Sequence, residues 1–421
     1  MAVAAQSVTD LCRAAKAAAR ELAALDSATK DRALLAVADA LEARAPEILE
    51  ANARDLEAGR EAGLSDALMD RLALDGGRIA GIARGVREIV ALPDPVGEVI
   101  DGRTFANGLQ MRKVRVPLGV VAVVYEARPN VTIDAAALCL KSGNAIVLRG
   151  SSSAAHSNAV LAGIAREAAE ANGLPGGALT LVAGGGREEL AELGAQEGLI
   201  DLMIPRGGEG LKRALQAVAK VPVIYAASGN CHVYVDATAD LAMAEAIVLN
   251  AKTQRPGVCN AAETLLVHAD VAEDFLPAAL SALHGAGVEL RGDERVRSLA
   301  GEIPVAAATD EDYAEEFLAL VLAVRVVDSA EEAIEHIGAY GSGHSEAIVT
   351  ASVGAARAFQ LGVDAACVYV NASTRYTDGG EFGMGAEIGN STQKLHARGP
   401  IGLRELCTFK YLVEGTGQVR A

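Results

Sequence analysis

Short apolar runs alternate with longer helix-type segments from residue 119 onward, and this alternation constrains the fold more than any other feature. Strands joined by helices lie parallel in one sheet, because each helix returns the chain to the edge where the next strand begins. Aromatic residues make up only 3% of the chain, so the core must be aliphatic, which suits helices packed on a parallel sheet. The pattern predicts a doubly wound α/β domain. Its expected strands are GVVAVVY, NAIVLRG, ALTLVAG, LIDLMIP and VPVIYAA, with helices at 131–141, 154–172 and 208–219 among the segments between them.

A second α/β unit begins near Gly229. No linker rich in Pro, Gly or Ser separates it from the first unit, so we expect the two units to pack closely with a cleft between them. The fold class expected from these patterns is α/β, with two doubly wound domains. The expected strands of the second unit are CHVYVD, ETLLVH, FLALVLAVRVV, HSEAIVT and ACVYVN, with helices at 241–252, 272–285, 331–337 and 352–361.

The segment before the first sheet divides into a helical block and a hairpin. Residues 1–92 have the apolar spacing of amphipathic helices, and we expect three helices with breaks near 26–27, 62–63 and 75–77. The next stretch, GEVIDGRTFANGLQMRKVRVPLG, alternates polar and apolar residues around Asn107-Gly108, a dipeptide that favours hairpin turns. Isolated hairpins are marginally stable in water. We therefore expect this hairpin to dock on a second subunit, in a homo-oligomer.

Charge and cysteine usage exclude several classes of protein. The net charge is −17 without a long basic block, which argues against nucleic acid or an anionic membrane surface as a partner. No apolar run reaches the ~18 residues that cross a bilayer, and the N-terminus lacks the apolar core of a signal peptide. Six scattered cysteines form no disulfide framework, and seven histidines show no zinc motif, so no metal is expected. These features predict a protein of the reducing cytoplasm.

A single thiol, Cys259, follows the turn-rich run QRPGV and precedes the strand-type run TLLV. A loop before a buried strand can hold a thiol both exposed and fixed in place, and reactive groups concentrate on such loops. A nucleophilic cysteine needs nearby positive charge, which Arg255 offers, and donors for the oxyanion formed on attack at a carbonyl. Asn130, after a buried-type strand, is the best candidate donor. The alternatives are a small buried hydrophobe for Cys259 and a helix N-cap for Asn130.

Glycines and arginines follow three strands of the first sheet at the end where parallel sheets bind ligands. They are Arg149-Gly150-Ser151-Ser152, Gly184-Gly185-Gly186-Arg187 and Pro205-Arg206-Gly207-Gly208. Neither G-x-G-x-x-G nor a Walker A sequence occurs. Glycine turns that hold a nucleotide and ordinary turns are both compatible with this pattern. The arginines could bind the phosphate group of a phosphorylated ribose.

Four long stretches carry a resemblance to the aldehyde dehydrogenase superfamily. They are VYEARPNVTIDAAALCLKSGNAIVLRG, LIDLMIPRGGEGL, NAKTQRPGVCNAAETLLVH and VNASTRYTDGGEFGMGAEIGNSTQKLHARGPIGLRELCTFKY. The last resembles the branch of the superfamily that reduces L-glutamyl 5-phosphate. The resemblance implies NADPH-dependent formation of L-glutamate 5-semialdehyde with release of phosphate, in the second step of proline synthesis from glutamate.

The resemblance also implies roles for individual residues. Cys259 matches the nucleophile that forms a thioester, and Asn130 matches the asparagine of the oxyanion hole. Arg149, with Gly150 and Ser151 beside it, takes the place of a lysine near the adenosine ribose, Glu316 matches a glutamate that holds the nicotinamide ribose, and Arg206, Gly207 and Gly208 match the loop beside the cofactor phosphates. Hydrolytic members carry a water-activating glutamate where this chain has Ser228-Gly229-Asn230. The absence of that base favours a reductase, because the thioester must survive until hydride arrives.

These inferences predict which parts of the chain form each domain. Residues 1–98 and 117–228 are expected to bind NADPH, residues 229–402 to form the catalytic domain, and residues 99–116 with 403–421 to form a small β flap for oligomerisation. Arg128, Lys394 and Arg398 are candidate ligands of the substrate carboxylate or phosphate. The upstream glutamate kinase is a candidate partner. An acylating dehydrogenase that uses coenzyme A and a catalytically silent scaffold are the rival interpretations.

Overall fold

The computed structural model describes residues 7–184, 186–225 and 229–420, and the chain forms two compact units. Unit 1 contains Met1–Tyr225, Gly383–Gly389 and Ile401–Ala421, and unit 2 contains Ala226–Phe382 and Asn390–Pro400. The sequence-based boundaries placed residues 383–389 and 401–402 with the second domain, so the two divisions differ there. The α/β class and the parallel sheets are confirmed.

Residues 7–92 form five helices where three were expected. The breaks at 26–27, 62–63 and 75–77 are present, and the side chains of Ser7, Asp26, Ser65 and Asp75 cap four of the helices. The additional break lies at Arg44, and Pro46 follows it in the first turn of the next helix, where its missing N–H is not needed. The helices are α1 (Val8–Leu22), α2 (Ser27–Ala43), α3 (Ala45–Glu61), α4 (Asp66–Leu72) and α5 (Gly76–Ala91).

The sheet of unit 1 is parallel, in the order β5-β4-β3-β6. Tyr125, the last residue of β3, lies opposite Gly150 on β4 and Arg206 on β6, so these three strands end at the same edge. The expected strand VPVIYAA is described only for residues 221–225, where it makes one isolated bridge, from Val223 to Met203, in place of a full strand. The elements are β3 (Val120–Tyr125), α6 (Asn130–Lys141), β4 (Ala145–Gly150), η1 (Ser152–Ala154), α7 (Ala155–Ala171), β5 (Leu179–Leu181), α8 (Arg187–Gly194), β6 (Leu202–Arg206) and α9 (Glu209–Val218).

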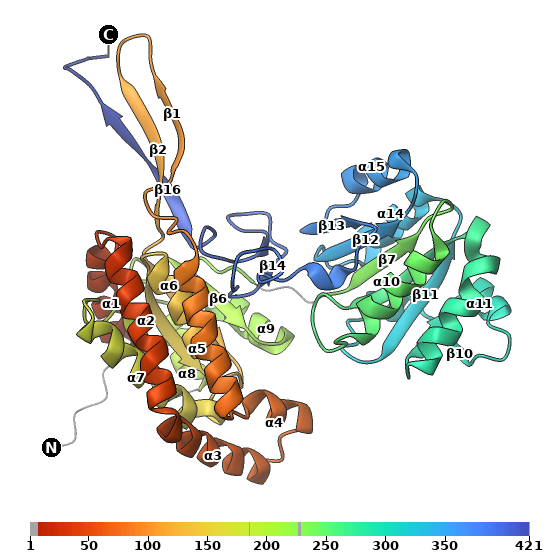
Figure 1. The fold of residues 1–421 in the computed structure, drawn as a ribbon, viewed down its shortest axis with the longest axis horizontal. Helices are drawn as coiled ribbons and strands as arrows, with labels where there is room; N and C mark the ends of the chain where they lie inside the picture. Colours follow the sequence, from red (N-terminus) through yellow and green to blue (C-terminus); the bar gives the residue numbers. More distant parts are fainter. Residues whose placement is uncertain (1–6, 185, 226–228, 421) are drawn as a thin grey trace. The chain divides into compact units, whose positions relative to one another are not determined.

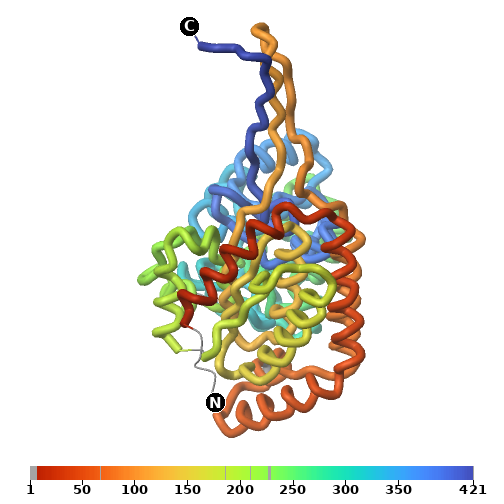
Figure 2. Tube along the Cα trace, turned by 90° about the vertical axis from the view of Figure 1, so that its left-hand side faces the viewer, coloured from red at the N-terminus to blue at the C-terminus, as the bar shows by residue number. Residues whose placement is uncertain are grey.

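An antiparallel arm projects from the helices of unit 1 (Figures 1 and 2). It has the order β1-β2-β16, with β1 (Val99–Thr104), β2 (Gln110–Pro117) and β16 (Cys407–Glu414). The hairpin predicted around Asn107-Gly108 is confirmed, and Gly108 adopts φ 87°, a conformation that favours glycine. The arm exposes large apolar side chains, namely Val99, Ile100, Phe105, Phe409, Tyr411 and Val413.

Unit 2 is built on a seven-stranded parallel sheet in the order β10-β9-β11-β8-β7-β12-β13. The short elements between residues 286 and 316 were not predicted from the sequence, and β11 begins four residues later than the run FLALVLAVRVV. The strands are β7 (Cys231–Val235), β8 (Ala262–His268), β9 (Glu289–Gly292), β10 (Val305–Ala307), β11 (Val321–Val327), β12 (Ser345–Val349) and β13 (Cys367–Val370). The helices are α10 (Leu241–Thr253), α11 (Ala269–Gly285), α12 (Glu294–Leu299), α13 (Asp310–Ala314), α14 (Ala330–Tyr340) and α15 (Val353–Gly362).

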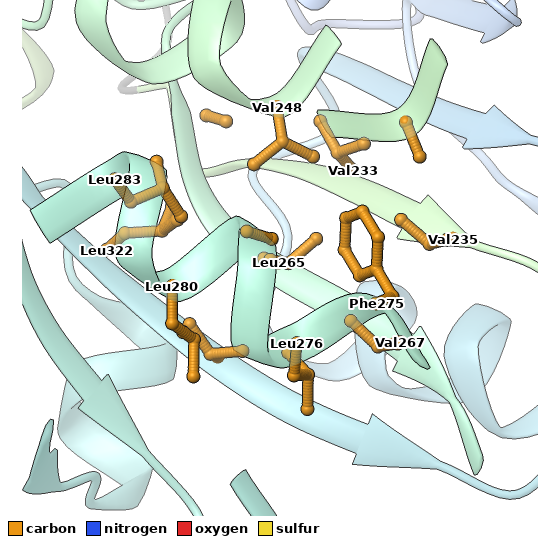
Figure 3. Close-up of a cluster of buried hydrophobic side chains, with 14 of the residues drawn as sticks. Val233, Val235, Val248, Leu265, Val267, Phe275, Leu276, Leu280, Leu283 and Leu322 are labelled. Carbon is orange, nitrogen blue, oxygen red and sulfur yellow. The ribbon is translucent and has the colours of Figure 1, made fainter. Parts of the chain in front are cut away.

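Both faces of this sheet are buried, which explains the continuous apolar runs of its strands. On one face, Phe275, Leu276, Leu280 and Leu283 of α11 pack on side chains of β7, β8 and β11 (Figure 3). On the other, Leu266 of β8 packs in a second cluster with residues of α14 and α15. Each fully buried side chain of this size stabilises the fold by roughly 1.5–3 kcal/mol. The core therefore fixes β8, and with it the loop that precedes it.

The rest of unit 2 consists of short elements. They are the 3-10 turn η2 (Thr374–Tyr376) and the two-stranded pair β14 (Asn390–Ser391) and β15 (Gly399–Pro400). Among the described residues, no helix combines the length and apolar character that crossing a bilayer requires.

Candidate active site

Cys259 lies in the loop between α10 and β8 and is half-buried. Other thiols of the chain are held protonated by burial, which raises the pKa of Cys12 to about 11 and that of Cys407 to about 12 and also raises the pKa of Cys139 and Cys231. Because the thiolate is the reactive form, such buried thiols are inert. Cys259, in contrast, is only half-buried.

The backbone around Cys259 is held from strand β7. A Cβ added to Gly229 would lie 1.5 Å from the carbonyl oxygen of Cys259 and 2.5 Å from its Cα, so only glycine fits there. The Cys231 Sγ donates to the same carbonyl oxygen at 3.2 Å. Glu316 joins this arrangement, because its Oε1 accepts a hydrogen bond from the Gly229 N–H at 2.6 Å. The predicted cofactor residue Glu316 thus lies one hydrogen bond from the segment that packs on the thiol loop.

The next residue, Asn260, ties the loop to the turn η2. Its Nδ2 donates to the carbonyl oxygens of Arg375 and Thr377 at 3.2 and 2.9 Å, and its own carbonyl accepts from Thr374 Oγ1 at 2.7 Å. These bonds bring Arg375 to the loop, where its Nε donates to Gln254 Oε1 at 2.9 Å. Residues 374–377 therefore form part of the surroundings of the thiol loop.

Two arginines supply positive charge near the thiol. Burial and the neighbouring Arg255 lower the pKa of the Arg375 guanidinium, while the negative charge available at Cys259 raises it. The three groups are thus close enough to influence one another. Arg255 was visible in the sequence by its spacing from the thiol. Nothing in the pattern showed that Arg375 reaches this loop.

Lys394 and Arg398, the predicted substrate ligands of unit 2, both pair with Asp364. The Arg398 Nη1 donates to Asp364 Oδ1 at 2.8 Å, and Lys394 forms an ion pair with the other carboxylate oxygen. Arg128, in unit 1, lies in the turn between β3 and α6. The assignment of these three cations to the substrate stays a prediction.

The segment Ser228-Gly229-Asn230 is described only in part, since Ser228 lies outside the described residues. The Asn230 Nδ2 donates to the carbonyl oxygens of Tyr313 and Tyr340 at 2.7 and 2.9 Å, which is a structural role. The carboxylate that reaches this segment is Glu316, and one of its oxygens is engaged by Gly229.

A cavity of about 340 Å³ in unit 1 is lined by two of the predicted cofactor residues, Gly150 and Ser151. Its remaining walls come from α7, β5 and the residues after β5, including Asn158, Arg166 and Gly184. A Cβ on Gly150 would lie 2.1 Å from Asn158 Nδ2, so a side chain there would collide with the wall. Arg149 lies beside it, donates to the Gly186 carbonyl at 2.6 Å, and has a pKa lowered by burial.

The residues that follow β6 form a second candidate binding site in unit 1, at the N-terminus of α9. The N–H of Gly208, the N-cap residue of α9, donates to Glu126 Oε2 at 3.1 Å, and a Cβ on Gly207 would lie 2.6 Å from the Glu126 carboxyl carbon. A helix N-terminus attracts anions, and here a carboxylate fills that place. Arg206 is packed against Gly389, where an added Cβ would lie 2.6 Å from the Arg206 Nη1.

Asn130 is the first residue of α6, just after β3. Pro129 occupies the N-cap position without a capping side chain, so Asn130 does not serve as the N-cap. Its Nδ2 donates to Asp134 Oδ2 at 2.9 Å. Burial raises the pKa of Asp134 to about 6, although the positive charge of Arg206 acts to lower it. The strand register brings Arg149 and Arg206 to one edge of the unit 1 sheet, and Asn130 begins the helix that follows β3 at that edge.

No cluster of three or more His, Cys, Asp or Glu side chains suited to a metal ion occurs among the described residues.

Comparison with known proteins identifies the family. A model of the aldehyde dehydrogenase family matches residues 1–296. The gamma-glutamyl phosphate reductase of Thermobifida fusca is 57% identical over 415 residues, which cover 99% of each chain. The crystal structure of gamma-glutamyl phosphate reductase from Thermotoga maritima matches with a TM-score of 0.96 and 45% identity, over 99% of this chain and 100% of that one. An acetylating aldehyde dehydrogenase from Geobacillus thermoglucosidasius shares the fold, with a TM-score of 0.70 at 21% identity over 98% of this chain and 97% of that one. The chain therefore belongs to the aldehyde dehydrogenase family and, within it, to the gamma-glutamyl phosphate reductases.

Proposed function

We propose that this protein reduces L-glutamyl 5-phosphate to L-glutamate 5-semialdehyde with NADPH and releases phosphate, in proline synthesis from glutamate. The observation that carries the proposal is the half-buried thiol of Cys259, clamped by Gly229, Cys231 and Asn260 in a chain 57% identical to a named gamma-glutamyl phosphate reductase. Membership of the aldehyde dehydrogenase family implies a nicotinamide cofactor.

In the proposed reaction, the Cys259 thiolate attacks the acyl carbon of the acyl phosphate. The carbon–sulfur bond forms as the carbon–oxygen bond to phosphate breaks, which gives a thioester and inorganic phosphate. Asn130 and the Cys259 backbone N–H would stabilise the oxyanion, a contribution worth ~10²–10³ in rate per donor in other enzymes. Arg255 and Arg375 would favour the thiolate and attract the phosphate. The thiolate is the leaving group again when the aldehyde is released.

A bound nicotinamide would supply the hydride that reduces the thioester carbon. The cavity beside Gly150 and Ser151 is the candidate site for the adenosine end of the cofactor, because it lies where β4 and β5 end. Arg149, Arg206, Gly207 and Gly208 would hold the ribose and phosphates, and Glu316 the nicotinamide ribose. The preference for NADPH over NADH is part of the proposal.

The reverse reaction tests the proposal most directly. With glutamate 5-semialdehyde and NADP, we expect oxidation that requires inorganic phosphate and is unaffected by coenzyme A. Oxidation that depends on coenzyme A would favour the rival acylating dehydrogenase. No oxidation with either acceptor would favour a silent scaffold.

Substitution at the thiol tests the mechanism. We expect Cys259→Ala to abolish turnover while NADPH binding and the unfolding temperature persist, because the side chain is small and only half-buried. Cys367→Ala is a matched control, since it removes a second half-buried thiol from strand β13. Substantial activity in Cys259→Ala would contradict the thioester mechanism.

The arm of β1, β2 and β16 is proposed to join a second subunit. Exposed apolar side chains such as Phe409, Tyr411 and Val413 are costly in water and typical of interfaces. Light scattering should give an oligomer, and a monomer would refute this assignment. Transfer of substrate from the upstream glutamate kinase, and a cytoplasmic location, stay predictions.

A further inference from the structure

A second cavity, of about 190 Å³, lies within unit 2 beside α14, α15 and β12. Ile334, Ile337 and Val363 form apolar walls, and glycine backbone forms much of the remainder. Glu346 of β12 and Asp364, which follows α15, also line it. Cys259, Arg255 and Arg375 do not line this cavity, whereas the predicted substrate ligands Lys394 and Arg398 pair with its lining residue Asp364.

Glu346 is the unusual member of the lining. Its side chain is fully buried, and its Oε2 lies 2.7 Å from the backbone N of His232, which donates to it, and 2.9 Å from His232 Nδ1. Its other oxygen, Oε1, has no hydrogen-bond partner among the described residues. A Cβ added to Gly341 would lie 3.1 Å from Oε1, and Gly341 lines the cavity. Oε1 is therefore the carboxylate oxygen on the cavity side.

A buried carboxylate oxygen without a partner is costly, so the cavity should hold a hydrogen-bond donor. A cationic donor gains more than a neutral one, because charge-assisted hydrogen bonds are stronger and a buried carboxylate repels anions. The cavity is smaller than the ~300–1,000 Å³ of pockets for drug-sized ligands, so the ligand must be small. The walls formed by Ile334, Ile337 and Val363 suit a short hydrocarbon body.

Three charged groups lie beside one wall of the cavity. Asp364 stands there, and its carboxylate is paired with Lys394 and Arg398. Lys394 and Asp364 are largely exposed, so water screens their charges, whereas Glu346 is fully buried. Charge recognition therefore rests on Glu346.

We propose that this cavity binds a small alkylammonium ion, with its ammonium group on Glu346 Oε1 and its alkyl chain against Ile334, Ile337 and Val363. The inference is independent of the proposed catalytic function, because binding of the ion is measured without substrate or cofactor.

Isothermal titration with n-butylammonium chloride tests the site, with sodium chloride at equal ionic strength and neutral n-butanol as comparison ligands. We expect saturable binding of n-butylammonium and at least ten-fold weaker binding of n-butanol. Glu346→Gln keeps the size and one acceptor for His232 but removes the charge, so it should weaken n-butylammonium binding at least ten-fold. Glu335→Gln removes the same charge from the exposed face of α14 and should leave binding unchanged.

A second variant leaves Glu346 intact. Gly338 lines the cavity, and a Cβ added there meets no atom within 4 Å, so Gly338→Leu should fold and narrow the space. It should weaken binding of n-butylammonium. If Glu346→Gln does not fold, this variant provides the test of the proposed site. Equal binding of the alcohol and the ammonium ion, no binding to the wild type, or undiminished binding to a folded variant would overturn the proposal.

Discussion

Replacing Gly229 with alanine should displace the thiol loop. The new Cβ would lie 1.5 Å from the Cys259 carbonyl oxygen and 2.3 Å from its carbonyl carbon. Non-bonded heavy atoms need about 3.5 Å, so the two backbone segments must separate by roughly 2 Å. The obstacle is backbone, which cannot rotate aside as a flexible side chain could.

The size of the effect follows from this displacement. Overpacking costs about 1–3 kcal/mol, which corresponds to roughly 2–4 °C of unfolding temperature per kcal/mol in a domain of this size. A catalytic group misplaced by ~1 Å can lose ~10²-fold in rate, so turnover should fall by at least that factor. The rate at which iodoacetamide alkylates Cys259 should change as well.

Thermal unfolding, turnover and alkylation are measured on Gly229→Ala and on a control, Gly81→Ala. Gly81 lies inside α5, and a Cβ there meets no atom within 4 Å. The control should be stabilised by roughly 0.5–1 kcal/mol, because alanine favours the helix. If Gly229→Ala kept the wild-type unfolding temperature and half of the wild-type activity, the argument from close backbone packing would be refuted.

Three further predictions concern charges in unit 2. Lys252 and Glu263 form a fully buried ion pair, so Lys252→Met should cost about 3–5 kcal/mol in chemical denaturation, and the double variant Lys252→Met/Glu263→Leu should recover most of it. Burial lowers the pKa of His344 to about 4, so the unfolded chain takes up a proton below pH ~6.5 that the folded chain refuses. Stability should thus fall as the pH drops from 6.5, by about 2 kcal/mol at pH 5, and His344→Asn should flatten that loss in urea unfolding. Arg375→Gln should raise the Michaelis constant for phosphate in the reverse assay several-fold, while Lys410→Gln on the arm should leave it unchanged.

The sequence predicts the sheet edges well, because strand type and order depend on local patterns. The apolar run before Arg128 and the run that ends at Gly150 both form strands, and the alternation alone places their carboxyl ends together. Short elements escaped this reasoning. β9 and β10 have four and three residues, too few for a periodic pattern to stand out.

Side-chain partners across long separations could not be predicted either. Lys394 and Arg398 are cations in a glycine-rich tail, a pattern that favours anion binding, yet both pair with Asp364, about 30 residues earlier. Glu316 was placed by family resemblance, and its bond to Gly229 spans 87 positions. Such pairings depend on how the sheet brings distant segments together, which no local pattern encodes.

The position of the thiol departs from a rule that holds in unit 1. Ligands of parallel sheets bind beyond the carboxyl ends of the strands, where Gly150 and Arg206 lie, but Cys259 precedes β8 and so lies at the amino edge of its sheet. At that edge, carboxylate side chains accept hydrogen bonds from backbone N–H groups of residues 229–232. Glu316 accepts from Gly229 at 2.6 Å, and Glu346 accepts from His232 at 2.7 Å. With these amides fixed, the Gly229 backbone can lie against Cys259 without shifting, so the placement of the nucleophile depends on carboxylates far along the chain.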